Sequence, residues 1–124
     1  WPKCQGSFLP SLEGPGIFIQ MIHRAGAVVV GLVLVMATAA MRNHQPLSSG
    51  DADLVKMAEI TTGVWILNVL VGGSYIVFAK IGDFPEWLSL LHLVVGVSAF
   101  LSSMAMVFAV RLAGTSVPEG VESE

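Results

Sequence analysis

The sequence predicts an all-α integral membrane protein, and three observations lead to this fold class. Apolar residues make up 54% of the 124 residues, whereas charged residues make up only 12%. A soluble domain of this length needs a larger charged surface. The mean hydropathy is positive, at +0.76. Finally, three separate stretches each provide roughly 20 mostly apolar residues, the length that crosses a bilayer as a helix.

The three predicted transmembrane helices cover residues about 17–41, 60–79 and 87–113. Together they form one transmembrane domain, residues 17–113, between an extracytoplasmic loop (residues 1–16) and a polar C-terminal tail (residues 114–124). Lys80 and Arg111 lie at helix ends, where a long cationic side chain can reach water.

The two connections differ in character. Residues 42–59 are predicted as a polar loop, in which "SSGDAD" offers N-cap residues for a short amphipathic lead into the second helix. Residues 80–86 are predicted as a tight turn. There Pro85 suits an early helical position and Glu86 suits the positive end of the helix dipole.

The crossings alternate, so the first and third helices run in the same direction. One side of the membrane would carry three cationic residues, Arg42, Lys56 and Arg111, and the other side two, Lys3 and Lys80. This distribution favours a cytoplasmic position for the 43–59 loop and the tail. We therefore expect a protein of the cytoplasmic (inner) membrane whose Cys4 loop is extracytoplasmic.

Cys4 is the only cysteine. It is either a free thiol or one half of a disulfide whose partner lies upstream of Trp1. The chain begins without the pattern of a signal peptide, and we expect a further segment before Trp1. The net charge of −3 and the lack of a basic run indicate no nucleic-acid partner.

Two histidines stand inside predicted spans, where ionisable groups are costly and usually functional. His23 lies about six residues into the first helix and His92 five to seven residues into the third. Because both helices enter from the same side, both imidazoles are predicted roughly 8–10 Å below the same surface. This matched depth indicates two axial ligands of one haem. His44, in contrast, is predicted to be a solvated loop residue.

Small residues lie beside both histidines at helical spacings. They are Gly26, Ala27 and Gly31 near His23, and Ser89, Gly96, Ala99 and Ser103 near His92. They either leave room for a porphyrin, with Gly26 and Gly96 the best candidates, or serve tight helix packing.

Three further polar residues stand in or beside the predicted helices. Arg24 is predicted as an interfacial anchor, as a partner for haem propionates, or as both, since its fork binds carboxylates. Asn68 is predicted to hydrogen-bond across helices. Tyr75 faces either the cofactor or the interface. Six scattered methionines are interpreted as packing residues.

In order along the chain, "WPKCQGSFLP", "QMIHR", "NVLVGG" and "LHLVVGV" resemble one half of a haem A synthase. The resemblance covers roughly residues 1–110. It implies a four-helix haem-binding bundle whose first helix lies upstream, with His23 and His92 as the axial pair bound to haem iron. It also implies that Cys4 is the second cysteine of an outer-loop pair.

Gln20 departs from this family. The catalytic half carries a glutamate three residues before the first histidine, implicated in oxidising haem O. A glutamine cannot act as an acid or base, and "QxxHR" resembles the half that holds a resident haem b. Catalytic residues therefore stay unassigned, and Glu13 and Glu86 do not match the motif.

Three functions compete. The first is haem A synthase activity, the oxidation of haem O to haem A. The second is electron transfer by a permanent haem b, within a respiratory or photosynthetic membrane complex. The third is a structural membrane subunit without haem. Haem b is the preferred cofactor, with haem O or haem A as alternatives. We expect a homo-oligomer or larger complex, with an unidentified electron donor.

Overall fold

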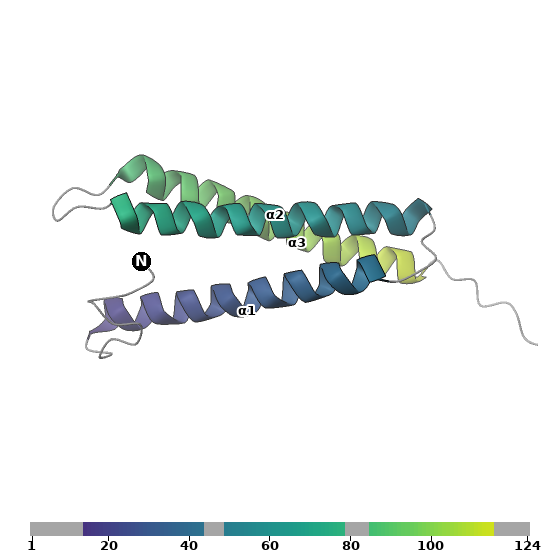
Figure 1. Ribbon diagram of the computed structural model, residues 1–124, viewed down its shortest axis with the longest axis horizontal. Helices are drawn as coiled ribbons and strands as arrows, with labels where there is room; N and C mark the ends of the chain where they lie inside the picture. Colours follow the sequence, from purple (N-terminus) through teal and green to yellow (C-terminus); the bar gives the residue numbers. More distant parts are fainter. Residues whose placement is uncertain (1–13, 44–48, 79–84, 116–124) are drawn as a thin grey trace, which may run out of the picture.

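A computed structural model describes residues 14–43, 49–78 and 85–115 (Figure 1). These residues form three long helices, α1 (Pro15–Asn43), α2 (Ser49–Phe78) and α3 (Glu86–Thr115). In the described ranges only Gly14 and Pro85 lie outside a helix. The predicted all-α fold class is confirmed.

All three helices are long and apolar enough to cross a membrane. Their most apolar windows bury only 11%, 17% and 11% of their residues inside the protein. Most large apolar side chains are therefore exposed, including Val28, Leu70 and Phe100. Such faces are stable in lipid and unstable in water, so the surroundings of these helices are a bilayer.

The starts of α1 and α3 follow from their prolines. Gly14 has φ = 99°, which favours glycine, and Phe18 N–H donates to its carbonyl at 3.3 Å. Pro15 then fills the first helical position, where its missing N–H costs nothing. Pro85 lies one residue before α3, rather than inside it as predicted. Its carbonyl accepts hydrogen bonds from the N–H groups of Leu88 and Ser89.

The start of α2 differs from the prediction. The apolar span was expected from about residue 60, after a short amphipathic lead with N-cap residues in "SSGDAD". The helix begins at Ser49, within that segment, and runs unbroken to Phe78. The residues 49–59 expected as a loop with an amphipathic lead are therefore continuous helix. Their charged side chains favour contact with water. The segment is nevertheless helical, because Leu, Lys, Met, Ala and Glu are good helix formers. Hydropathy located the apolar part of the helix, whereas the helix itself begins earlier.

α2 contacts both other helices, and α3 crosses behind it in the view of Figure 1. At one end of the bundle the three helices share an apolar cluster of Leu34, Ala58 and Met106, with Met41, Met57 and Trp65 packed against it. Toward the other end, α1 diverges from α2. No Cα atom of α1 lies within 8 Å of a Cα atom of α3. Contact between these two helices therefore depends on side chains.

Candidate functional site

The two membrane histidines lie together at the diverging end of the bundle. His23 on α1 and His92 on α3 have ring centroids 6.2 Å apart, with their planes at 86°. Both helices begin at this end (Figure 1), which confirms that they run in the same direction. The two rings are therefore close together, although no Cα atom of α1 lies within 8 Å of a Cα atom of α3.

A hydrogen bond from Nδ1 orients the His92 ring. Its Nδ1 lies 3.1 Å from the backbone carbonyl oxygen of Asn68 on α2. A carbonyl only accepts, so Nδ1 carries the proton and donates. In the neutral ring Nε2 is then the unprotonated nitrogen, the form that binds a metal ion.

Gly72 makes room for this arrangement. It lies one turn after Asn68, and a Cβ atom built on it would stand 2.7 Å from Cε1 and 3.0 Å from Nδ1 of His92. Any larger residue would push the ring away from the carbonyl. The sequence interpretation gave Gly72 no role. The sequence feature that could have indicated such a role is the position of this glycine one turn after Asn68, a polar residue in the middle of a span.

Asn68 links α2 to α3 through its backbone carbonyl rather than through its side chain. The cross-helix hydrogen bond is accepted by its backbone carbonyl. Its side-chain Oδ1 is buried and has no hydrogen-bond partner among the described residues. The amide packs beside Gly96, whose Cβ position would lie 3.4 Å from Nδ2. Gly96 therefore lies at the contact between α3 and α2.

The small residues of α1 divide into two groups. Gly26 is exposed, and nothing lies within 4 Å of the position of its Cβ. Gly31 is buried, and a Cβ there would overlap the ring of Trp65 on α2. An indole therefore fills the space beside Gly31. Of the two uses predicted for these glycines, close helix packing applies to Gly31.

Two further candidate residues, Gln20 and Arg24, lie near the start of α1. Gln20 is exposed and stands one turn before His23, whereas Arg24 is half-buried. Cys4 and Glu13 lie outside the described residues, as does His44.

An open hollow of about 540 Å³ adjoins His92. It lies between the end of α2 and the first two turns of α3. Its lining residues are Tyr75, Glu86, Ser89, Leu90, His92 and Leu93. Tyr75 therefore shares this hollow with His92.

The donor set limits the metal chemistry of the site. Within residues 14–43, 49–78 and 85–115, no three His, Cys, Asp or Glu side chains are grouped to hold a metal ion. A bare zinc ion needs more protein ligands than the two imidazoles. A metal ion that brings its own planar set of ligands, as in haem, needs only two axial ligands. The histidine pair fits the second case.

Comparisons with known proteins give no match, so a function is proposed from the geometry of the site. No protein-family model, no curated protein and no solved structure matches the chain.

Proposed function

We propose that this chain is a haem-binding integral membrane protein in which His23 and His92 are the two axial ligands of one haem. The observation that carries the proposal is the 6.2 Å separation of their ring centroids. Each imidazole would hold the haem iron through one ring nitrogen, and the closeness of the two rings would allow one iron to take both. Perpendicular ring planes are compatible with such a pair because each ring can turn about its own metal–nitrogen bond.

The chain's own residues prepare one of these ligands. The Asn68 carbonyl keeps the proton on Nδ1 of His92, which orients the ring and leaves Nε2 as the unprotonated nitrogen. Gly72 keeps the space in which the ring lies. Arg24 stands next to His23 in the chain and is proposed to pair with the propionates.

The resemblance to haem A synthase supports an oxidation of haem O to haem A as the first candidate activity. A bound haem would supply one-electron redox chemistry between the two imidazoles. Gln20, one turn before His23, favours the alternative of a haem b electron-transfer subunit, since an amide side chain cannot exchange a proton in the membrane. Haem b is accordingly the proposed resident cofactor.

Further protein is proposed to cover the histidine end. His23 is exposed in the single chain, and a metal-binding imidazole at membrane depth is normally enclosed by protein. A second copy of the chain or another subunit would enclose it. We place this end at the extracytoplasmic side of the inner membrane, following the distribution of cationic residues.

The ligand assignment is tested with His23→Ala and His92→Ala variants, purified from membranes in mild detergent. Pyridine-haemochrome spectra and chromatography of the extracted haem give its amount and type. Each variant should lose most of the haem, while the control His44→Ala should retain it. Unchanged haem content in both variants would disprove the assignment.

Two measurements separate the candidate activities. Chromatography of haems from membranes carrying the protein and supplied with haem O detects the synthase reaction. An electron-transfer subunit should leave haem O unchanged and give a low-spin reduced spectrum that carbon monoxide does not alter. Carbon monoxide binding would contradict a six-coordinate haem b.

A further inference from the structure

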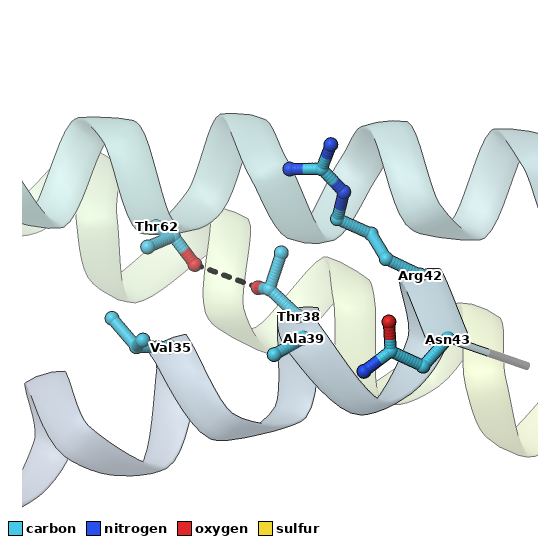
Figure 2. A pocket seen from close by; sticks show the side chains of 6 residues that line it. All are labelled: Val35, Thr38, Ala39, Arg42, Asn43 and Thr62. Atoms are coloured by element: carbon cyan, nitrogen blue, oxygen red, sulfur yellow. Dashed lines mark hydrogen bonds between the residues drawn. The ribbon is translucent and has the colours of Figure 1, made fainter.

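A second hollow lies at the opposite end of the bundle from the histidines. It has a volume of about 310 Å³ and lies between the last turns of α1 and the facing turn of α2 (Figure 2). Its lining residues are Val35, Thr38, Ala39, Arg42, Asn43 and Thr62. None of these residues takes part in the proposed haem site.

The threonine side of this hollow is fixed by hydrogen bonds. Oγ1 of Thr38 donates to the carbonyl oxygen of Ala58 at 3.4 Å and lies 2.9 Å from Oγ1 of Thr62. Because a hydroxyl has one proton, Thr62 is the donor in the second bond. Both hydroxyl protons are therefore used inside the protein. The donors left for a ligand are the guanidinium of Arg42 and the side-chain amide of Asn43.

Arg42 extends from the end of α1 toward α2 (Figure 2). Its Nη1 lies 3.5 Å from Oε1 of Glu59, and the two side chains are 65% and 46% exposed. Such a long, exposed pair contributes little to stability. Only one guanidinium nitrogen takes part in the contact, so the fork can also bind an anion with two oxygens, although Glu59 would compete with it.

The lining changes from apolar to cationic along the membrane normal. Val35 and Ala39 lie toward the bilayer centre, and Arg42 and Asn43 lie one to two turns further out. No charged residue separates Arg24 from Arg42, and their spacing corresponds to about 27 Å of helix. Arg42 is the basic residue in the last turn of α1, and a long cationic side chain at the end of a spanning helix can reach the lipid phosphates.

We propose that this hollow binds an anionic phospholipid, with its phosphate on Arg42 and Asn43 and the start of an acyl chain against Val35 and Ala39. The order of apolar and cationic groups in the hollow matches the order of chain and phosphate in a lipid. Free phosphate has the same oxygen chemistry but nothing to place against the apolar part. The lipid site stands independently of haem binding.

The test is a titration of the purified, delipidated chain in neutral detergent with phosphatidylglycerol, read by native mass spectrometry. Arg42→Gln should weaken binding about tenfold, the loss expected for a charge-assisted phosphate contact. Glu59→Gln breaks the same ion pair but keeps the cation, so affinity should be unchanged or higher. Arg111→Gln removes a cation from the same membrane edge outside the hollow and should have no effect.

The apolar part is tested separately. Ala39→Leu fills it without changing charge and should also weaken phosphatidylglycerol binding, while inorganic phosphate should fail to displace the lipid. Circular dichroism reports whether each variant remains helical.

Three results would overturn the proposal. Equal losses in Arg42→Gln and Glu59→Gln would mean that the arginine acts only through its ion pair. An equal loss in Arg111→Gln would indicate unspecific attraction. Displacement by inorganic phosphate would indicate an anion site rather than a lipid site.

Discussion

Nδ1 of His92 donates a hydrogen bond to the backbone carbonyl oxygen of Asn68, 3.1 Å away on the neighbouring helix. This bond fixes which nitrogen of His92 is available to a metal ion, and the backbone rather than a side chain provides the acceptor. The bond requires close approach of the ring to α2, which Gly72 permits.

Gly72→Ala should displace the His92 ring, because the new methyl group would stand 2.7 Å from Cε1. Overpacking of this kind costs about 1–3 kcal/mol. We expect a lower melting temperature and a haem content below that of the wild type. The matched control is Gly63→Ala on the same helix, where nothing lies within 4 Å of the added atom. If both variants retain equal haem, Gly72 does not position the ring.

Asn68→Ala should retain the hydrogen bond to His92, since the acceptor belongs to the backbone. The variant removes an Oδ1 atom that has no partner in the described part of the chain. Haem content, measured by the pyridine-haemochrome spectrum, should therefore stay close to the wild-type value. A loss as large as that of His92→Ala would show that the side chain itself holds the site.

Gly31→Ala should weaken the packing of α1 on α2, because the added methyl group overlaps the ring of Trp65. The expected loss is about 1–3 kcal/mol of unfolding free energy, measured by denaturation in detergent micelles. Gly26→Ala serves as the control on the same helix, where the added atom has open space. Alanine also favours helix over glycine, so this control should be neutral or slightly stabilising. Equal stability of the two variants would contradict the close contact at Gly31.

Thr61→Val and Thr62→Val should change stability in opposite directions although the residues are adjacent. Thr61 is fully buried, and its hydroxyl has no partner among the described residues, so valine removes an uncompensated polar group. Thr62→Val breaks the bond to Thr38 and should cost about 0.6 kcal/mol, a typical value for a hydrogen bond between membrane helices. Thermal unfolding of both variants provides the comparison. A destabilised Thr61→Val protein would indicate a hydrogen-bond partner for that hydroxyl.

Sequence patterns located the membrane helices well and their polar ends less well. The predicted end of the second helix at residue 79 is one residue from Phe78, but its predicted start near residue 60 is eleven residues from Ser49. Hydropathy reports where a chain leaves lipid, and a helix can continue past that point into water. The shared depth of His23 and His92 followed from counting residues along parallel helices.

The sequence alone did not show which residues the small and polar side chains contact. Gly26 and Gly31 have the same spacing pattern around His23, yet one faces open space and the other faces an indole. Thr61 and Thr62 are adjacent threonines, yet only Thr62 reaches Thr38. Such differences depend on which face of α2 meets each neighbour.

The sequence by itself determined that this chain forms transmembrane helices, because the length and apolar content of a segment decide whether it can cross a bilayer. Only the tertiary structure decided that α2 packs against both α1 and α3, that His92 donates to Asn68, and that Arg42 lines a hollow with Thr38 and Thr62. The physical reason is that helices in lipid have apolar residues on nearly every face. Their relative rotation is therefore set by the close fit of small residues and a few hydrogen bonds, rather than by an amphipathic pattern.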